Sequence, residues 1–390
     1  MASRNRVLAL LALAELLGMS VWFSASALAP QFARAWTLSP AQTGWLTATV
    51  QLGFVAGTAV AAVLNLADIV PLRVYFALAA LAAAACNLAL LAAGGFAPAL
   101  VSRFGTGFFL AGVYPPAMKM IATWYKDSRG FAIGTIVGAL TVGKAMPYLV
   151  HGLDRAGAAP VVLGASGAAA LAGVLVFAAY RDGPHGFERR PFAWSLVGRV
   201  LHHRETRLAI GGYLGHMWEL YAMWTWIAVF LAAGAGFGQR AADVGGFAAI
   251  AVGGAGCVAG GRLADRYGRE RLTIWAMAIS GASAAVIGLG AASPVLVLAV
   301  ALVWGFTVVA DSAQFSALVT ELAPPHAVGT ALTLQTSLGF LLTMASIQLV
   351  PRLVAGVGWR WAFVALAAGP VAGIVAMRRL QRLRARSASV

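Results

Sequence analysis

Long apolar segments constrain this chain more than any other feature of its sequence. A helix needs about 20 predominantly apolar residues to cross roughly 30 Å of hydrocarbon. Twelve such segments follow one another along the chain, near residues 7–30, 43–66, 72–94, 97–122, 130–152, 160–180, 208–233, 243–261, 272–291, 294–318, 327–350 and 360–377. Because backbone groups in lipid must be satisfied internally, these segments predict helices rather than short alternating barrel strands.

The composition favours a membrane protein over a soluble protein with a large core. Hydrophobic residues make up 61% of the chain and charged residues only 11%, whereas soluble domains carry about 25% charged residues. Too few polar residues remain to cover a soluble core, so the prediction is an all-α polytopic protein whose main partner is the lipid bilayer. The two cysteines, Cys86 and Cys257, lie within predicted spans and are interpreted as packing residues, without a disulfide or metal role.

Basic residues predict the orientation of the chain in a bacterial inner membrane. With the N-terminus in the cytoplasm, 20 of the 28 Lys and Arg residues fall in cytoplasmic segments. Six fall on the opposite side, namely Arg34, Arg103, Arg155, Arg240, Arg352 and Arg360, and two lie inside predicted helices. Both termini are therefore expected in the cytoplasm. The net charge of +15 then reflects topology and attraction to anionic lipid rather than binding to nucleic acid.

A polar stretch divides the chain into two halves of six spans. Residues 1–180 are expected to form an N-terminal bundle, 181–207 a cytoplasmic linker, and 208–390 a C-terminal bundle with a basic tail. The halves also resemble each other. "LNLADIVPLR" at 64–73 aligns with "GRLADRYGRE" at 261–270, and "AIGTIVGALTVG" at 132–143 aligns with "AVGTALTLQTSLG" at 327–339. The similar shifts predict a duplicated six-helix unit.

The charged hairpin "GRLADRYGRERL", 261–272, resembles a hallmark of the major facilitator superfamily, G-x-L-a-D-r-x-G-r-r. In that family it lies between helices 2 and 3 and often again between helices 8 and 9. The second copy is nearly complete, with Gly261, Leu263, Ala264, Asp265, Arg266, Gly268, Arg269 and Arg271. The first copy keeps Leu66, Ala67 and Asp68, with Arg73 nearby, but has Leu64 and Pro71 in place of glycines. "RFGTG" at 103–107 is similar to the family's Arg-x-x-x-Gly signature at the start of helix 4.

The resemblance implies a fold of twelve transmembrane helices in two pseudo-symmetric six-helix bundles and transport by rocking of the two halves. It implies a conformational latch at the hairpins, carried here by Asp68, Arg73, Gly261, Asp265, Arg266, Gly268 and Arg269. The alternative is a plain basic anchor on the cytoplasmic side. Helices 4, 5 and 7 are broadly similar in texture to bacterial anion and organic-acid permeases of the superfamily. Gly138-Ala139 replaces the Gly-Pro pair usual in helix 5 of its drug exporters.

Five ionisable residues inside predicted spans mark the candidate site, because such residues are costly in a membrane and usually face a cavity or a partner. They are Glu15, Lys119, Lys144, Glu219 and Asp311. Lys144 is expected to contact an anionic substrate, with Tyr148 and His151 on roughly the same face. Pairing with Glu15, Glu219 or Asp311, or snorkelling to the surface, are the alternatives. Pro115-Pro116 predicts a kink near Ala111 and Gly112, which brings Tyr114 and Lys119 to the substrate site.

Helix 7 supplies "GHMWELYAMWTW", in which His216 and Glu219 share a face. The pair is a candidate for proton coupling, together with Asp311 and Glu15; a static hydrogen-bonded pair is the alternative. Tyr221 and Trp224 are expected to form a stacking wall, although tryptophans in spans commonly face lipid. Gln314 and Gln335 complete the expected substrate-binding set.

Motifs for nucleotide-driven transport, hydrolysis or metal binding are missing from the sequence, so no enzyme activity, cofactor or metal is expected. The predicted function is secondary active transport, as a symporter or antiporter, of a small anionic solute such as a carboxylate or an inorganic oxyanion. Protons are the candidate coupling ion, and the protein is expected to be a monomer. The alternatives are a proton-coupled exporter of cationic or amphiphilic compounds and a non-transporting membrane sensor on the same fold.

Overall fold

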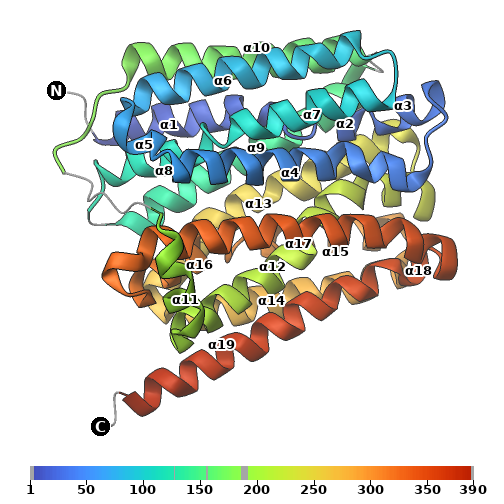
Figure 1. Cartoon of the computed structure of the whole chain (residues 1–390). Coiled ribbons are helices and arrows are strands. Elements are labelled where there is room, and N and C mark those ends of the chain that lie inside the picture. The colour runs from blue at the N-terminus through green and yellow to red at the C-terminus, as the bar shows by residue number, and fades with distance from the viewer. Residues whose placement is uncertain (1–3, 127, 155–156, 186–191, 388–390) are drawn as a thin grey trace.

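The computed structural model describes residues 4–126, 128–154, 157–185 and 192–387, and these residues form helices joined by short turns, with no strand among them (Figure 1). Ten helical segments of this described part are long and apolar enough to cross a membrane. They are Pro40–Val63, Leu72–Ala92, Phe96–Ala122, Gly130–Leu153, Ala158–Ala179, Gln239–Tyr267, Arg269–Gly290, Pro294–Leu322, Pro325–Val357 and Trp359–Arg386. Each matches one of the twelve segments expected from sequence.

Two expected spans are helical but fall outside that set of ten. The first is broken into α1 (Arg4–Gly18), a 3₁₀ turn (Met19–Val21), α2 (Ser24–Ala27) and α3 (Ala29–Ala35). The other is α12 (Arg204–Val229), which continues into a π-helical turn and is buried along most of its length. A helix surrounded by protein rather than lipid can carry polar and aromatic residues, and α12 carries both His216 and Glu219.

The helices form two groups that lie one above the other in Figure 1, one from α1 to α10 and one from α12 to α19. The remaining elements are α4 (Pro40–Val63), α5 (Leu66–Ile69), α6 (Leu72–Leu88), α7 (Phe96–Leu110), α8 (Tyr114–Ala122), α9 (Arg129–Asp154), α10 (Ala158–Ala179), α11 (Trp194–His202), α13 (Gln239–Tyr267), α14 (Arg269–Val286), α15 (Pro294–Thr307), α16 (Ser312–Leu322), α17 (Val328–Val357), α18 (Trp359–Ala362) and α19 (Ala368–Ser387). The groups meet mainly where α9 packs on α13 and α4 packs on α17.

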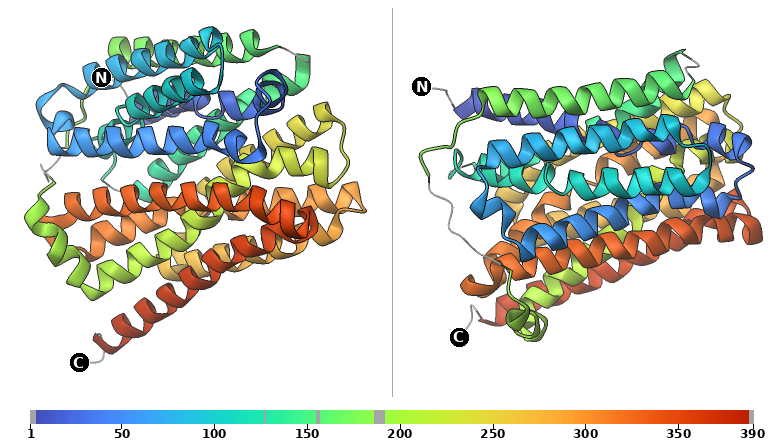
Figure 2. Two further views of the ribbon diagram at one scale, coloured as in Figure 1. Left: turned by 45° about the vertical axis from the view of Figure 1, so that its right-hand side comes forward. Right: turned by 45° about the horizontal axis from the view of Figure 1, so that its top comes forward.

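Both termini lie at one end of the bundle, which we call the termini end, and α3 and α18 lie at the far end (Figures 1 and 2). The linker expected at 181–207 lies at the termini end and contains the short helix α11, which sequence alone did not indicate. Residues 186–191 of that linker, and Arg155 of the orientation count, lie outside the described residues.

Glycines bring the second and fourth spans of each half into backbone contact. A Cβ added to Gly107 of α7 would lie 2.0 Å from the Val50 carbonyl oxygen of α4. In the C-terminal group, a Cβ added to Gly256 of α13 would lie 2.0 Å from the Phe306 oxygen of α15. Only small residues allow helices to approach this closely. The same contact in both groups is what a duplicated six-helix unit predicts.

Glycines also line the contact between the two groups, along the antiparallel helices α9 and α13. Cβ atoms added to Gly134 and Gly138 would lie 2.8 Å and 2.7 Å from carbonyl oxygens of α13. Nearer the termini end, a Cβ on Gly261 would lie 2.9 Å from the Gly130 oxygen. Along α9 and α13, the two groups therefore touch largely through backbone rather than through interlocked side chains.

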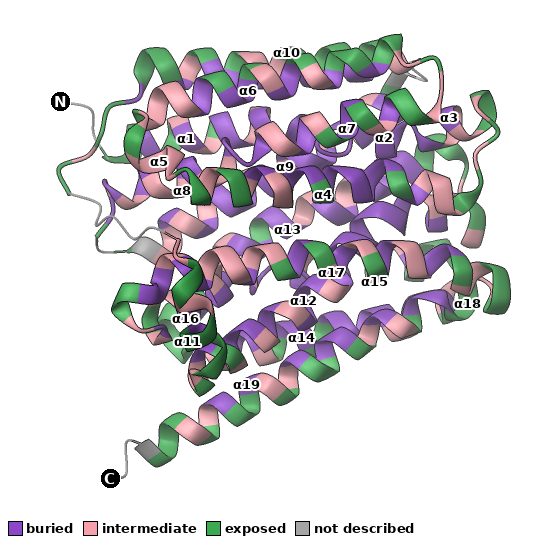
Figure 3. Ribbon diagram, in the orientation of Figure 1, coloured by how far each residue is buried: buried purple, intermediate pink, exposed green. Residues whose placement is uncertain are grey.

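The fourth span breaks at Ala111–Val113, between α7 and α8, where Pro115-Pro116 predicts it. The tenth span breaks at the corresponding place, between α15 and α16 at Val308–Asp311, without a proline. Large apolar side chains cover the outer surface, as expected for contact with lipid, while buried residues concentrate where helices face each other (Figure 3).

We expect Gly107→Ala to lower the melting temperature, because the new methyl group meets backbone that cannot move aside. Overpacking of this kind costs about 1–3 kcal/mol. Gly164→Ala on α10 is the matched control, since no atom lies within 4 Å of its added Cβ and alanine is the better helix former. Thermal unfolding of the purified protein in detergent measures both. Equal melting temperatures would show that the α4–α7 contact contributes little to stability.

Candidate functional site

A small cavity of about 60 Å³ lies between the two groups and is lined by both. Its described lining comprises Met19, Trp22, Phe54, Tyr114, Val137, Leu140, Thr141, Lys144, Tyr213, Met217, Leu220, Tyr221, Trp224, Val309, Ser312, Ser316, Thr336 and Phe340. Lys144 is the only Lys, Arg, His, Asp or Glu in this lining. The other side chains are mainly aromatic and aliphatic, so the cavity combines one cation with a largely apolar wall.

The Lys144 ammonium lies among aromatic rings. Its Nζ donates a hydrogen bond to the Tyr221 hydroxyl at 2.6 Å and lies 4.0 Å from the Trp22 ring centroid and 5.5 Å from that of Trp224. Contacts of a cation with ring faces are favourable, and more so away from water. Among the described residues, no ion pair joins Lys144 to a carboxylate. The structural pairing considered from sequence is therefore not formed.

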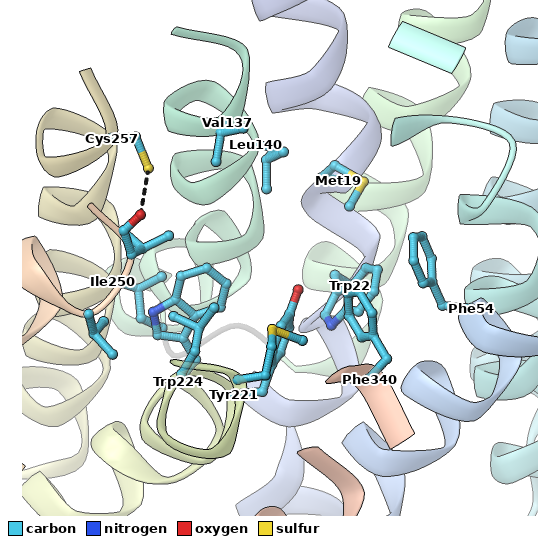
Figure 4. Packing of buried hydrophobic residues seen from close by; sticks show 14 of the residues in the cluster. Met19, Trp22, Phe54, Val137, Leu140, Tyr221, Trp224, Ile250, Cys257 and Phe340 are labelled. Atoms are coloured by element: carbon cyan, nitrogen blue, oxygen red, sulfur yellow. Dashed lines mark hydrogen bonds between the residues drawn. The ribbon is translucent and has the colours of Figure 1, made fainter. Parts of the chain in front are cut away.

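The aromatic residues around Lys144 pack into one cluster that spans both groups. The Tyr221 ring lies 5.7 Å from Trp22 and 5.2 Å from Phe340, measured between centroids. Figure 4 shows the Tyr221 hydroxyl pointing between Trp22 and Trp224. Tyr221 and Trp224 are buried and line the cavity instead of facing lipid.

Trp22 reaches the cavity because the first span is broken, and Arg103 holds the break. The Arg103 side chain is fully buried on α7. Its Nη1 donates to the Val21 carbonyl at 3.1 Å and to Asn87 Oδ1 at 2.9 Å, and its Nη2 donates to the Trp22 carbonyl. Carbonyls at a helix break have lost their helical donors, and a guanidinium supplies several donors in a fixed geometry. The positive-inside count places Arg103 at the far membrane face; the structure corrects this, because Arg103 is an interior residue.

Glu15 is the buried acid whose surroundings best suit the binding and release of a proton. It lies on α1 with no solvent exposure, and neither carboxyl oxygen has a hydrogen-bond partner among the described residues. Lys144 attracts it electrostatically. A carboxylate removed from water without donors is costly, so its surroundings favour a state in which the charge is neutralised by a proton or balanced by a cation.

The structure separates His216 from Glu219, so their expected mutual pair is wrong. His216 Nδ1 lies 2.9 Å from Asp311 Oδ1 at the break in the tenth span. Glu219 instead accepts hydrogen bonds from Ser280 Oγ at 2.8 Å and Trp304 Nε1 at 2.7 Å. The two side chains are three residues apart on α12, yet His216 reaches the break in the tenth span, whereas Glu219 reaches α14 and α15. Neither lines the cavity.

Lys119 also departs from its expected place. Its ammonium pairs with Asp68 and donates to the Ala67 carbonyl at 2.7 Å. It lies at the termini end, outside the cavity lining, because the loop carboxylate is the available counter-charge. This corrects its assignment as a substrate contact.

Three other expected substrate residues lie beside the cavity rather than on its wall. The Tyr148 hydroxyl donates to the Trp224 carbonyl at 3.3 Å, and Gln335 Nε2 donates to Ser316 Oγ at 3.4 Å. Gln314 accepts a 2.6 Å hydrogen bond from Arg269 Nη1 and so belongs with the charged hairpin. Tyr148 and Gln335 therefore each touch a residue of the wall, and Gln314 does not.

The second charged hairpin bridges the two groups. Gly268 makes the tight turn between α13 and α14 with φ of 90°, a conformation that favours glycine. The Asp265 carboxylate lies against Gly130 in the first turn of α9, where an added Cβ would be 2.9 Å from Oδ1. An acid at a helix N-terminus is favoured by the helix dipole. The Arg262 guanidinium adds a second bridge, 5.2 Å from the Phe131 ring centroid.

Gly261 also faces the other group, at Gly130, whereas the contacts described for Arg269, Arg266, Asp68 and Arg73 stay within their own groups. Arg269 pairs with Glu321 at 2.8 Å, and Arg266 lies 5.1 Å from the Tyr267 ring. In the first hairpin, Asp68 pairs with Lys119 and Arg73 lies 5.9 Å from the Phe177 ring. Among the described residues, contacts that join the two groups are therefore found at the second hairpin and not at the first.

Several wall residues were not anticipated from sequence, namely Trp22, Phe54, Tyr213, Ser316, Thr336 and Phe340. The stretch "SVWFS" at 20–24 carried a usable signal, because serines and aromatics interrupt an otherwise aliphatic span. The other residues resemble ordinary packing residues, and only their placement in space distinguishes them.

Replacing Arg103 tests the support of the broken span. We expect Arg103→Met to lower the free energy of unfolding by about 3 kcal/mol, since it leaves several buried acceptors without donors. Melting temperatures of the purified variants measure the effect. Arg352→Met removes an exposed arginine and should melt like the wild type. A wild-type melting temperature for Arg103→Met would contradict the supporting role.

The family follows from comparison with known proteins. A sequence profile of the Major Facilitator Superfamily matches residues 10–347. A crystal structure of a bacterial homolog of the human lysosomal transporter Spinster, inward-facing and unoccupied, is similar with a TM-score of 0.71 and 18% identity, covering 97% of this chain and 98% of that one. A mutant of the nucleoside transporter NupG is similar with a TM-score of 0.73 and 13% identity, covering 96% and 99%.

At these identities the two structures show the fold alone, while the profile covers most of the chain. None of the curated proteins searched matches this sequence. The chain belongs to the Major Facilitator Superfamily and is a multi-pass membrane transporter rather than an enzyme.

Proposed function

We propose that this transporter carries small organic anions, specifically carboxylates with an apolar or aromatic body, by alternating access and with protons as the coupling ion. The observation that carries the proposal is Lys144, the single cation of the cavity wall, which has no carboxylate partner in the described structure. An incoming carboxylate would place a negative charge in direct contact with Lys144, which Glu15 does not do here, and would accept a charge-assisted hydrogen bond.

The wall favours an organic anion over an inorganic oxyanion. Inorganic oxyanions present acceptors on every side and are usually held by several donors or by the forked guanidinium of arginine. Here one ammonium and the Tyr221 hydroxyl supply the polar contacts at one place, and Trp22, Trp224 and Phe340 offer ring surface beside them. A flat apolar body would pack against such rings.

Alternating access is supported by the cavity and by the contacts between the groups. Binding sites for small molecules usually enclose about 300–1,000 Å³, whereas this cavity holds about 60 Å³. A bound solute therefore requires the two groups to part. The smooth α9–α13 contact and the Asp265 bridge at its end are where such movement would occur.

Glu15 is the proposed proton carrier. Within the described part of the chain its oxygens have no hydrogen-bond donors, and it lies within electrostatic reach of the cation that would bind substrate. A carboxylate arriving at Lys144 competes with Glu15 for the same positive charge. Protonation of Glu15 would relieve that competition, so a proton and an anion would be favoured together, as in symport.

The alternative is transport of organic cations, which aromatic rings and an unpartnered acid also attract. It differs from the proposal in what Lys144 does. An organic cation would be repelled by the Lys144 ammonium. Replacing Lys144 with a neutral residue would therefore improve the binding of the organic cation rather than abolish it.

We expect benzoate to raise the melting temperature of the purified protein and to be taken up by proteoliposomes. Benzamide, benzyltrimethylammonium and phosphate test the neutral, cationic and inorganic alternatives. Lys144→Gln should weaken benzoate binding at least about thirtyfold, because truncating one member of a buried charge pair costs about 2 kcal/mol or more.

Lys126→Gln is the matched control, since Lys126 is exposed at the termini end. It should bind benzoate as the wild type does. Stabilisation by benzyltrimethylammonium alone, retained or increased in Lys144→Gln, would overturn the anion proposal in favour of cation transport. Binding without uptake of any probe would favour a sensor.

Glu15→Gln tests the coupling. The glutamine imitates the protonated acid and cannot release a proton, so uptake driven by an inward proton gradient should be lost while benzoate exchange across the membrane continues. Glu205→Gln, outside the wall, should keep both activities. Gradient-driven uptake that survives in Glu15→Gln would assign coupling to another group, with the buried His216–Asp311 pair next in line.

A further inference from the structure

A second and larger cavity opens at the far end of the molecule, again between the two groups. It encloses about 850 Å³ and is lined from the N-terminal group by Gln31, Arg34 and His151, and from the C-terminal group by Gln239, Arg240 and Asp243. Arg34 and Arg240 are exposed, whereas His151 and Asp243 are nearly buried at its inner side. The sequence did not single out Asp243, and it placed His151 only on the face of Lys144.

His151 and Asp243 join the two groups directly. His151 Nδ1, on α9, lies 2.8 Å from Asp243 Oδ2, on α13. Gln31 Nε2 lies 2.9 Å from His151 Nε2, and Gln239 Nε2 donates to Asp243 Oδ1 at 3.1 Å. The pair thus mirrors the Asp265–Gly130 contact, which joins the same two helices at the termini end.

The pair is also linked to the central cavity. His151 follows Lys144 by two helical turns on α9, and Pro147 lies between them. A proline inside a helix removes one backbone hydrogen bond and loosens the helix there. Tyr148, one turn before His151, donates its hydroxyl to the carbonyl of Trp224, a residue of the central wall. A movement of the α9 end that carries His151 would therefore also displace Tyr148 and the residues next to Lys144.

We propose that His151 and Asp243 form a proton-binding site facing the far-end cavity, and that proton uptake there holds the two groups together at this end. The inference rests on the alternating access proposed above, because opening of the central site toward the far end requires this contact to break. It assigns a second proton site, distinct from Glu15, whose role is to choose the side to which the transporter opens.

The direction of the effect follows from the hydrogen bonds. With Gln31 Nε2 donating to His151 Nε2, the neutral imidazole carries its proton on Nδ1 and donates it to Asp243. A second proton, on Nε2, makes the ring an imidazolium, turns the contact into a charge-assisted ion pair, and requires the Gln31 amide to present its oxygen. Acid on the far side therefore strengthens the contact, and basic conditions weaken it.

The charged and titratable groups near the pair are Arg34, Arg240 and Tyr148. Arg34 of α3 and Arg240 of α13 line the same cavity and oppose a second proton, but both are exposed and screened by water. Tyr148 on α9 faces the central site through its hydroxyl. Asp243 itself is in direct contact and favours the imidazolium.

Distances between spin labels across the far-end mouth test the proposal. Ala35→Cys and Ala241→Cys place labels at exposed positions of the two groups, in a background with Cys86→Ala and Cys257→Ala, and the protein is reconstituted in lipid nanodiscs without substrate. We expect the ratio of long to short distances to rise about fivefold from pH 5.5 to pH 8, because the ring donates to the Asp243 carboxylate as a cation in acid and as a neutral group in base.

His151→Gln, which can still donate to Asp243 but cannot change charge, should show one distribution at both pH values. His326→Gln removes an exposed histidine at the termini end and should keep the wild-type response. A wild-type distribution that does not change with pH overturns the proposal, as does a pH response that persists in His151→Gln. Because no substrate is present, a failed benzoate experiment leaves this outcome unaffected.

Discussion

The Arg103 guanidinium, buried against the broken first span, is the interaction on which the central site depends. A span that runs as one helix satisfies its own backbone and presents a regular face. This span stops at Gly18 and resumes at Ser24, and the carbonyls released there need donors that lipid and apolar side chains cannot supply. Arg103 supplies them from a different helix. With the break fixed, Trp22 turns toward Lys144, and the aromatic cluster around the ammonium becomes possible.

The other central helices also depart from regular apolar structure, and polar contacts from neighbouring helices compensate for the departure. α12 is less apolar than the ten spanning segments because it carries His216, Glu219 and Tyr221. The fourth and tenth spans are interrupted at their breaks. Each loss is compensated inside the protein, for instance by Ser280 and Trp304 around Glu219. Glu15 is the exception, because its oxygens have no such partners. An uncompensated acid beside a substrate-facing cation is therefore the natural place to look for coupling.

Much of the architecture could be predicted from sequence, because hydrophobic length and the repeated hairpin are local or one-dimensional signals. The kink at Pro115-Pro116 and the turn at Gly268 belong to the same class. The sequence also allowed the prediction that Lys144 points into the protein interior between the two groups, since a lysine in a membrane span is costly when it faces lipid. What failed was pairing. His216 and Glu219 share a helical face, yet their partners come from helices far away in sequence, and Lys119 found its counter-charge in a loop. Spacing along one helix defines a direction, but not which neighbour stands there.

The α9–α13 contact has a consequence for the speed of transport. Side chains that interlock must be lifted past one another, and that creates a barrier at each step of a relative movement. Gly134, Gly138 and Gly261 present backbone without side chains to the opposite helix. The two groups can therefore move along this contact without a large steric barrier. The stable states are then set only at its two ends, by Asp265 and by His151 with Asp243. A bulkier residue in the middle of this contact would meet the opposite backbone, and we expect it to disfavour the arrangement described here and to slow turnover.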